Sequence, residues 1–281
     1  MTLPIPTLDH VVINVRDQID AGAEAFRRLG FTLTPRGYHT LGSVNHLAMF
    51  GTDYLELIAA PIGNKSRPDI LGAPLGLNGL VFGTEDSAAV HAALTDAGVP
   101  CGAPLSFSRP VTLDDGSSSD AAFRTVTLTA GTVPAGRIYF CHHFTRHLVW
   151  RDEWRHHANG TIAVARAVIA ARDPSQSAGV FARMFGPDSV REIQGGFSLA
   201  VGLSRFDLLR PEALRNQFGE AAPAAEGRAE FMAALSLRTR SLDQAAAALS
   251  AGQIEGAWRE DNRIVVPASA AFGCAIEFVE V

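Results

Sequence analysis

The sequence predicts an α+β fold made of four consecutive βαβββ modules that pair into two domains. Three observations lead to this fold class. An apolar strand, a capped amphipathic helix and a glycine follow one another four times; β-like segments come after each helix; and the interval between the second and third modules is longer than the others. With 281 residues, the chain can form two domains that each bury a core.

The first two modules open in the same way. LDHVVINVRD leads into a helix that we expect Asp17 to cap and Gly30 to end, and LNGLVFGTED leads into one between Asp86 and Gly98. Each expected helix has one apolar face, made of Ile19, Ala23, Phe26 and Leu29 in the first and of Val90, Ala93, Leu94 and Ala97 in the second.

The third and fourth modules repeat the pattern. ARAVIAARD precedes a helix between Asp173 and Gly186, and FMAALSLRTR precedes one between Ser241 and Gly252. A capping side-chain oxygen satisfies amides of the first turn, and glycine tolerates the left-handed conformation that ends the last turn. Apolar residues again share one face, namely Phe181, Met184 and Phe185 in the third helix and Leu242, Ala245, Ala246 and Leu249 in the fourth.

Alternating apolar segments after the helices predict the remaining strands. In the first module they are FTLTP, NHLAMFG and DYLELIAA. The later modules close with GRIYFCHH, SRFDLLRP and CAIEFVEV. Within SFSRPVTLDDGSSSD, residues 106–120, we expect the Asp-Gly-Ser cluster to be an exposed loop between strands.

The longer central interval contains FTRHLVWRDEWRHHANG, a charged segment with two tryptophans. We therefore expect an N-terminal domain over residues 1–146, with modules at 6–62 and 75–146. A connector follows over 147–160, and a C-terminal domain over 161–281 has modules at 161–211 and 229–281.

Composition excludes several classes of partner. The net charge is −5, with no basic run, so neither a nucleic acid nor an anionic membrane is expected to bind. No secretory signal and no long apolar stretch is present, which predicts a cytoplasmic protein without a membrane span. The three cysteines, Cys101, Cys141 and Cys274, lie far apart and are expected to be reduced.

The opening LDHVVINVRD, the stretch GSVNHLAMFGTDYLELIA and the connector FCHHFTRHLVWRDEW resemble the vicinal-oxygen-chelate superfamily, and within it the glyoxalase-like domain family. The resemblance covers the whole chain. It implies that each pair of modules curls into a cup-shaped sheet, with metal ligands on the first and last strands of a module. The superfamily contains isomerases, dioxygenases, thiol transferases and drug-binding proteins without catalytic activity, so the fold alone does not specify a reaction.

The resemblance places His10 and Glu56 at the two ligand positions of the first module. In the second module Gly79 occupies the opening position, and two registers leave either Phe140 or His142 at the closing one. With His142 facing the cup, His10, Glu56 and His142 would form a three-ligand metal site with open positions.

In the last two modules the opening positions hold Arg166 and Ala233, and the closing ones hold Asp207 and Glu277. The resemblance disfavours extradiol dioxygenase chemistry, because the two histidines of that iron site are missing from this degenerate C-terminal domain. We expect Asp207 and Glu277 to pair with Arg166 or another basic residue.

Other residues are candidates for substrate binding. Strand alternation places Tyr54 on the face of Glu56, and Asn45 and His46 lie on the preceding strand. Trp150 and Trp154 would share one face of a helix, either packed between the domains or forming an aromatic wall for a ligand. The five histidines in and just before the connector match no compact zinc motif, and most of them are expected at the surface or in interdomain hydrogen bonds; they are His142, His143, His147, His156 and His157.

The resemblance implies a metal-dependent lyase or isomerase acting on a small molecule with two adjacent oxygens. Its cofactor would be a divalent metal such as Zn, Ni, Mn or Fe, and Glu56 would be the catalytic base. The alternative is a non-enzymatic protein of the bleomycin-resistance type that binds a drug or metabolite in the cup. Gly79, at the opening ligand position of the second module, favours this alternative because a glycine there leaves the set of metal ligands incomplete. The resemblance leaves a homodimer open.

Overall fold

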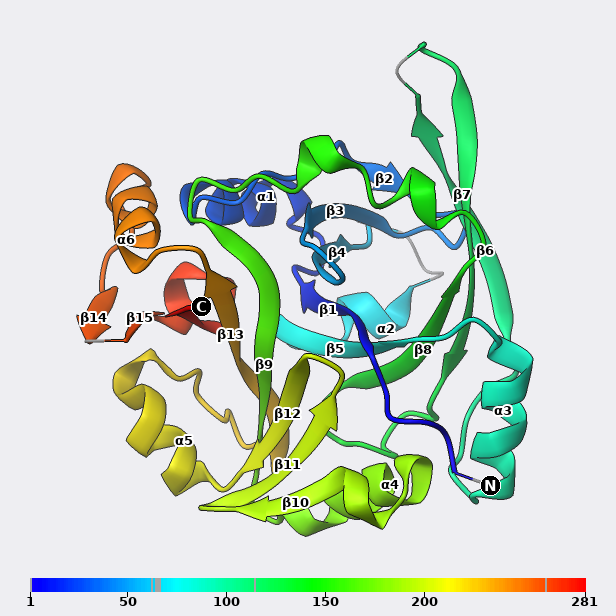
Figure 1. Cartoon of the computed structure of the whole chain (residues 1–281). Helices are drawn as coiled ribbons and strands as arrows, with labels where there is room; N and C mark the ends of the chain where they lie inside the picture. Colours follow the sequence, from blue (N-terminus) through cyan, green and yellow to red (C-terminus); the bar gives the residue numbers. More distant parts are fainter. Residues whose placement is uncertain (1, 62, 64–66, 114, 261) are drawn as a thin grey trace.

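The structure is a computed structural model that describes residues 2–61, 63, 67–113, 115–260 and 262–281. Strands from the first half of the chain form one eight-stranded sheet, and strands from the second half form another (Figure 1). Each sheet comes from two βαβββ units, so the predicted fold class is confirmed.

The first sheet and its helices occupy the N-terminal half of the chain. The strands are β1 (Leu8–Asn14), β2 (Gly37–Tyr38), β3 (Val44–Met49), β4 (Tyr54–Ala59), β5 (Gly76–Gly83), β6 (Leu105–Thr112), β7 (Ser118–Thr127) and β8 (Arg137–His143). The helices are α1 (Ile19–Arg28), α2 (Pro68–Leu71) and α3 (Ser87–Asp96). Two 3-10 turns, η1 (Arg146–Leu148) and η2 (Asp152–Trp154), lie in the connector.

The second sheet repeats this order. Its strands are β9 (Thr161–Ala171), β10 (Val190–Ile193), β11 (Gly196–Val201), β12 (Ser204–Leu209), β13 (Glu230–Thr239), β14 (Trp258–Glu260), β15 (Arg263–Val266) and β16 (Ala275–Glu280). The helices are α4 (Pro174–Phe185), α5 (Pro211–Phe218) and α6 (Leu242–Ala251). Short 3-10 turns are η3 (Pro187–Ser189), η4 (Gly219–Ala221) and η5 (Ala268–Ala270).

The first sheet has the strand order β2-β3-β4-β1-β5-β8-β7-β6. Its two modules meet at the antiparallel pair of β1 and β5, while β1 and β4, like β5 and β8, are parallel neighbours. The edges of the sheet approach each other, because the backbone amide of Thr40, just after β2, donates to the carbonyl of Ser108 in β6 at 3.0 Å. The sheet therefore curls into a cup.

Three of the four predicted helix caps are confirmed. Side chains of Asp86, Asp173 and Ser241 accept hydrogen bonds from amides of the following turn. The prediction for Asp17 is wrong, because Gln18 is the N-terminal cap and makes no capping side-chain bond. A left-handed residue, Arg16 with φ of 54°, turns the chain just before this helix and moves its start.

The glycines at the helix ends are required for two different reasons. Gly30, Gly98 and Gly186 have positive φ as expected, but Gly252 has φ of −79° and Gln253 takes the left-handed conformation instead. Gly252 is required for close approach, since a Cβ atom there would lie 1.8 Å from the carbonyl oxygen of Arg28 in α1. This contact joins the first module to the last.

The Asp-Gly-Ser cluster forms an exposed turn between two strands, as expected. Antiparallel pairing joins β6 and β7 in a long hairpin, from Leu105 opposite Thr125 to Thr112 opposite Ser118. Its tip projects from the rest of the molecule at the upper right of Figure 1. The turn between the strands covers residues 113–117, of which residue 114 lies outside the described residues.

Buried apolar side chains form three clusters. The largest lies between the two sheets and includes the apolar faces of the main helices, with contacts such as Phe82 against Phe185 at 5.0 Å between ring centroids. The other two lie on the concave faces of the sheets. In the second cup, Leu214 and Phe218 of α5 fill this face, whereas the first cup keeps an open cavity.

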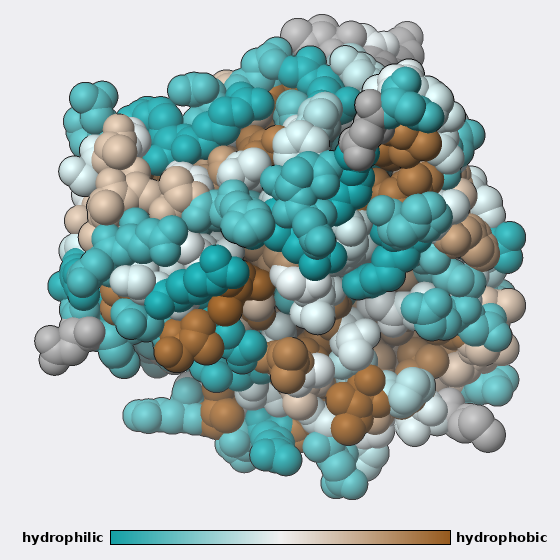
Figure 2. All heavy atoms as spheres, turned by 45° about the horizontal axis from the view of Figure 1, so that its top comes forward, coloured by the Kyte–Doolittle hydropathy of each residue, from teal (hydrophilic) through white to brown (hydrophobic). Residues whose placement is uncertain are grey.

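The connector packs along the rim of the first cup. Trp150 and Trp154 lie in or beside two separate 3-10 turns rather than on one helix, and both contact the concave-face cluster of the first sheet. Among the described residues, no helix combines the length and apolarity that a bilayer crossing requires. Figure 2 shows a face on which hydrophilic side chains predominate and hydrophobic ones appear as separate small groups.

Candidate functional site

A cavity of about 610 Å³ occupies the concave face of the first sheet. Every strand of the first module except β2, together with β6, β7 and β8 of the second, contributes side chains to its wall, and Val149 of the connector closes part of it. The wall combines aromatic rings with charged groups, which is typical of a site for a small organic molecule.

His10 lies at the cavity wall and is held from behind by Asp9. The pairing of β1 with β5 shifts register between Leu8 and His10, and this bulge brings the consecutive side chains of Asp9 and His10 together. Nδ1 of His10 lies 2.6 Å from Oδ1 of Asp9, which also accepts a hydrogen bond from Nε2 of His143 at 3.0 Å. Burial alone would raise the pKa of Asp9, but His143 and His10 lower it below its ordinary value. The ionised carboxylate therefore orients His10 with Nε2 toward the cavity.

Glu56 is the buried carboxylate of the site. Its Oε1 accepts a hydrogen bond of 2.6 Å from Nδ2 of Asn45, and its Oε2 lies 3.7 Å from Nε2 of His10. Burial favours the protonated form, but His10, His39 and the Asn45 hydrogen bond together lower the pKa of Glu56 below its usual value. Glu56 is thus a carboxylate at neutral pH, with only 5% of the residue exposed.

Tyr139 takes the closing position of the second module. Gly79 pairs with Arg137 as His10 pairs with Tyr54, so Tyr139, two residues further along β8, is the equivalent of Glu56. Its hydroxyl lies 3.1 Å from Nε2 of His10, and burial raises its pKa well above the ordinary value. The protonated hydroxyl can therefore donate to His10 or to a bound oxygen atom.

The structure brings four of the predicted site residues together. His10, Glu56, Asn45 and Tyr54 all line the cavity, and the rings of Tyr54 and His10 stack at 4.4 Å. In this arrangement Tyr54 forms a wall for His10, and Asn45 fixes the carboxylate of Glu56.

The other three predicted residues do not line the cavity. His142 alternates with Cys141 and His143, so it faces away from the cup and stacks near Phe144; the expected set of His10, Glu56 and His142 is therefore not assembled. His46 points to the opposite face of β3 and donates to the carbonyl of Thr34. Trp150 packs behind the wall, edge-on to Tyr54 at 5.2 Å.

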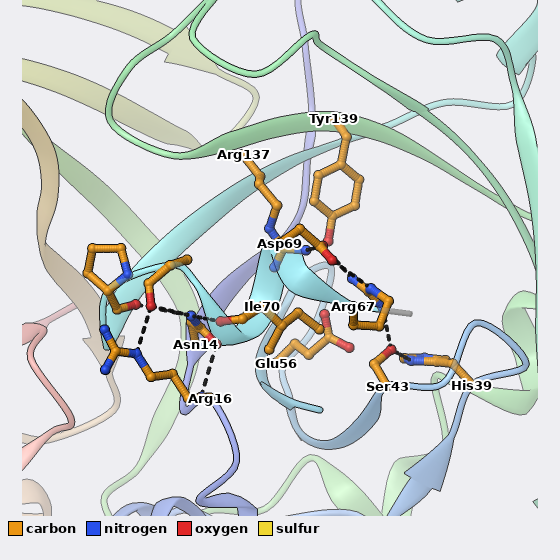
Figure 3. Close-up of polar contacts among 12 residues, drawn as sticks. Asn14, Arg16, His39, Ser43, Glu56, Arg67, Asp69, Ile70, Arg137 and Tyr139 are labelled. Atoms are coloured by element: carbon orange, nitrogen blue, oxygen red, sulfur yellow. Dashed lines mark hydrogen bonds and ion pairs between the residues drawn. The ribbon is translucent and has the colours of Figure 1, made fainter. Parts of the chain in front are cut away.

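Several polar residues that sequence reasoning missed also line the cavity. Figure 3 shows Asp69 of α2 between Arg137 and Arg67, with a chain of contacts running on through Ser43 to His39. Burial, with smaller contributions from nearby arginines, lowers the pKa of His39 to about 4, so its imidazole is neutral near pH 7. The sequence signal for these residues was weak, because they come from short turns and from a strand whose register was ambiguous.

Helix α2 is fixed above the cavity by the end of β1. The side-chain amide of Asn14 donates to the backbone carbonyls of Ile70 and Pro74, and the side chain of Arg16 donates to the carbonyl of Ala73 (Figure 3). These hydrogen bonds hold the segment that carries Asp69, so this part of the cavity rim has a fixed position.

The family's ligand positions in this cup supply few donor atoms for a metal ion. His10 and Glu56 supply two donors, Gly79 supplies none, and Tyr139 is a protonated phenol. A catalytic zinc site has three protein ligands. Among the described residues, no third His, Cys, Asp or Glu side chain comes within 4.8 Å of both donors. The residues of the cup do not fit a protein-held metal ion.

A second group of ligand-type residues lies behind His10. Donor atoms of Asp9, Cys141 and His143 all lie within 4.8 Å of one another. Oxygen, sulfur and nitrogen donors of this kind can hold a divalent cation. Here Asp9 already accepts hydrogen bonds from both imidazoles, and burial raises the pKa of the Cys141 thiol well above its ordinary value. The group forms a hydrogen-bonded cluster that positions His10, and a cation would have to displace these bonds.

The second cup contains an ion cluster where a site would otherwise be. Arg166 contacts Asp207 at 3.3 Å and Glu277 at 3.4 Å, which confirms the predicted pairing. Arg166 also donates to Ser236 and to Gln217 of α5. These groups satisfy one another, and the cavity beside them is smaller than that of the N-terminal cup, at about 410 Å³ against about 610 Å³.

Comparisons with known proteins agree with this fold. No curated protein sequence matches the chain. A hypothetical protein from Staphylococcus aureus has a similar structure, with a TM-score of 0.70 at 13% identity, covering 99% of this chain and 100% of that one. A triple mutant of 4-hydroxymandelate synthase from Streptomyces coelicolor has a TM-score of 0.60 at 13% identity, covering 99% and 93%.

A third similar structure is longer. It is a fusion of a xylose isomerase-like TIM barrel with 4-hydroxyphenylpyruvate dioxygenase, with a TM-score of 0.58 at 12% identity; the match covers 99% of this chain and 49% of the fusion. At these identities the likeness concerns the fold. A family model described as "Glyoxalase-like domain" matches residues 8–185. The chain belongs to this glyoxalase-like domain family of the vicinal-oxygen-chelate superfamily.

Proposed function

We propose that this protein is an acid–base enzyme, an isomerase or lyase, that moves a proton on a small organic molecule carrying two adjacent oxygens. One observation carries the proposal. A buried, ionised carboxylate, Glu56, lies 3.7 Å from an imidazole, His10, that a second carboxylate orients from behind at 2.6 Å. Buried acid and base groups of this kind in a cavity are characteristic of active sites.

Glu56 is the proton acceptor in this proposal. Its free oxygen faces His10 across the cavity floor, and the other is fixed by Asn45. A substrate carbon next to a carbonyl would lose its proton to Glu56. In an isomerisation of a 2-hydroxycarbonyl compound, this proton returns to the former carbonyl carbon and the hydroxyl proton passes to the former carbonyl oxygen. In a lyase reaction, the electron pair instead forms a double bond to the carbon on the side away from the carbonyl and expels a leaving group from it.

Tyr139 and His10 act on the oxygen. The hydroxyl of Tyr139 remains protonated and lies 3.1 Å from His10, so it can turn its hydrogen toward the oxygen on which negative charge develops. Because Asp9 holds Nδ1 of His10, the other ring nitrogen is free to exchange a proton with Tyr139. Asp9 is a positioning residue in this scheme.

No step of the proposed reaction uses a metal ion. Among the described residues, no third ligand-type side chain of the cup lies close enough to join His10 and Glu56 around one ion, and the cluster behind His10 is engaged in its own hydrogen bonds. Elemental analysis of the purified protein is expected to find less than about 0.1 divalent metal per chain. A stoichiometric metal that His10→Ala or Glu56→Ala removes would instead favour a metal-dependent lyase or isomerase.

Proton exchange tests the activity directly. We would incubate the protein in D₂O with 2-hydroxyaldehydes, 2-hydroxyketones and 2-oxo acids, and follow exchange at the carbon beside the carbonyl by NMR. Wild type is expected to exchange at least one of these, and Glu56→Gln to lose about 100-fold or more in rate. Glu24→Gln, at an exposed position on α1, is the matched control. The proposal fails if none of the compounds exchanges, or if Glu56→Gln exchanges as fast as wild type.

A small-molecule binding protein is the second candidate, favoured by Gly79 and Tyr139 at positions where ligands would be needed for metal chemistry. It predicts tight binding without exchange. Replacing His10 or Glu56 would then change affinity little, whereas the enzyme proposal expects Glu56→Gln to bind and not turn over. Calorimetry with a compound that binds, run beside the exchange assay, separates the two.

A further inference from the structure

Arg109 on β6 is a buried cation without a partner. It lines the cavity with 7% of the residue exposed, and its guanidinium forms no hydrogen bond or ion pair with any residue that the structure describes. The other two cavity arginines differ, because Arg67 and Arg137 both contact Asp69, at 2.8 and 3.3 Å. The described cavity wall thus holds three arginines against two carboxylates, Asp69 and Glu56, and Arg109 is the arginine that contacts neither.

Such a group is costly in the protein without a ligand. A guanidinium keeps its charge even when burial lowers its pKa, and an unpaired buried charge destabilises the fold. Glu56 attracts the guanidinium of Arg109 electrostatically without contacting it, and its carboxylate accepts a hydrogen bond from Asn45. An arrangement of this kind is expected where a ligand supplies the missing charge.

The chain makes room for this guanidinium. A Cβ atom on Gly37 of β2 would lie 3.3 Å from Nη1 of Arg109 and 2.3 Å from Oδ1 of Asn45. Both polar groups therefore flank the same point, close to the carboxylate that Asn45 holds. Oδ1 of Asn45 has no hydrogen-bond partner in the described part of the chain. Arg109 thus lies beside the acid–base group and not at a distant part of the wall.

The surrounding wall indicates what accompanies the negative charge. Phe107 precedes Arg109 by two residues on the same face of β6 and stacks on Phe123 of β7, with centroids 5.2 Å apart. His39, which is neutral, contacts the edge of Phe107. One unpaired guanidinium next to aromatic rings suits a single negative charge on an apolar body better than a doubly charged phosphate ester.

We propose that Arg109 binds the carboxylate of a small organic acid with an apolar or aromatic body, and thereby sets the substrate class of this cavity. The planar carboxylate would accept two parallel hydrogen bonds from the guanidinium, while the body lies against Phe107 and Phe123. The part of the molecule next to the carboxylate then lies near Asn45 and Glu56. The part of this inference that concerns turnover rests on the acid–base function proposed above; the binding part does not.

Binding of matched acids and amides tests the inference. The probes are butyrate, benzoate, phenylacetate and phenylglyoxylate, each with its primary amide, which has the same shape without the charge. In wild type the best acid is expected to bind about 10- to 100-fold more tightly than its amide, as measured by calorimetry. Arg109→Met should remove this difference, and Arg109→Lys should keep only part of it because a lysine cannot bind in a fork.

Arg124→Met on the neighbouring strand β7 is the matched control, since Arg124 bonds Ser106 and does not line the cavity. It should keep the preference for acids. Without ligand, Arg109→Met should melt at a higher temperature than wild type, because the unpaired charge is gone; a purely structural arginine would give the opposite shift. Glu56→Gln should keep the preference for acids while losing exchange, which separates this inference from the proposed function.

The inference is overturned if none of the four acids binds at millimolar concentration. It is equally overturned if acids and amides bind alike to wild type, if Arg109→Met keeps the preference, or if Arg109→Met lowers the melting temperature.

Discussion

At the scale of single residues, Asp53 is a buried carboxyl group whose hydrogen bonds offset the cost of its burial only in part. It lies just before β4, 3% exposed, and its Oδ1 accepts a hydrogen bond of 2.9 Å from the backbone amide of Val164 in β9. Burial raises the pKa of Asp53 to about 6, and the two hydrogen bonds to its side chain, from Val164 and Thr52, offset this only in part. The side chain links the two halves of the molecule but is costly when ionised.

This pKa predicts a particular pH dependence. The folded protein holds the Asp53 proton up to about pH 6, whereas the unfolded chain releases it near its ordinary pKa of 3.8. The contribution of Asp53 to stability is therefore full below pH 4 and falls as the pH rises from 4 to 6. Asp53→Asn keeps an acceptor for Val164 without the charge. We expect it to be more stable than wild type by about 2 to 3 kcal/mol at pH 7.5 and equally stable at pH 4.

Urea denaturation at a series of pH values would measure this difference. Asp120→Asn, at an exposed position on β7, is the control and should show no such trend. An Asp53→Asn variant less stable than wild type at pH 7.5 would mean that the charged form of the side chain is needed in the contact between β4 and β9.

How far the site could be predicted also depends on individual residues. His10 and Glu56 could be predicted because the resemblance to the glyoxalase-like family places them at the two ligand positions of the first module. Tyr139 was missed because the closing strand of the second module allows more than one register, and neither of the two considered was the observed one. In the fourth module a bulge between Met232 and Ala234 moves the opening position from Ala233 to Ala234. A bulge leaves no clear trace in the order of residues.

At the scale of elements, the Asp-Gly-Ser cluster lies at the turn of the β6–β7 hairpin, as expected between strands. The strands on either side of it were not given a register, so Arg109 was missed. With strand alternation applied, Phe107 and Arg109 would have been placed on one face together. The helices were easier to predict, because a capping residue and an apolar face are local features that do not depend on register.

The contact between α1 and α6 is the element-scale prediction. Arg28 donates to the carbonyls of Gly252 and Gln253, and Gly252 approaches the carbonyl of Arg28 too closely for any side chain. Gly252→Ala should therefore destabilise the protein by about 2 to 4 kcal/mol, through forced separation of the two helices. Thermal melting would measure it.

Gly179 offers the matched control. It lies inside α4 with no atom within 4 Å of an added Cβ, so Gly179→Ala should be neutral or stabilise the protein by up to about 1 kcal/mol. If both substitutions had the same effect, the close approach of Gly252 to Arg28 would not be a structural requirement.

At the scale of the whole molecule, the two cups have diverged in what fills them. In the first, α2 and the connector cover a cavity with an acid–base group and an unpaired arginine. In the second, α5 packs into the concave face, and its Gln217 completes the hydrogen bonds of Arg166. The residues at equivalent strand positions have thus become a ligand site in one half and a structural ion cluster in the other.

This division predicts that Arg166 matters for stability and not for the cavity. Arg166→Met leaves Asp207 and Glu277 buried with weaker compensation from Arg205 and Arg263, which still contact them. Loss of one partner from a buried ion cluster lowers the free energy of unfolding by about 3 to 5 kcal/mol. Because Arg205 and Arg263 remain, we expect a loss of about 3 kcal/mol. The affinity of the N-terminal cup for carboxylic acids should not change, because the two sites lie in different sheets.

A combined variant identifies the cause of that loss. Arg166→Met together with Asp207→Asn and Glu277→Gln removes all three charges, and it should recover most of the lost stability because no buried charge is left unpaired. Urea denaturation gives the stabilities, and calorimetry with the best acid gives the affinity. If the combined variant were as unstable as Arg166→Met alone, the arginine would stabilise the cup through packing against Phe218 rather than through its charge. A change in acid affinity in Arg166→Met would show instead that the two cups are energetically coupled.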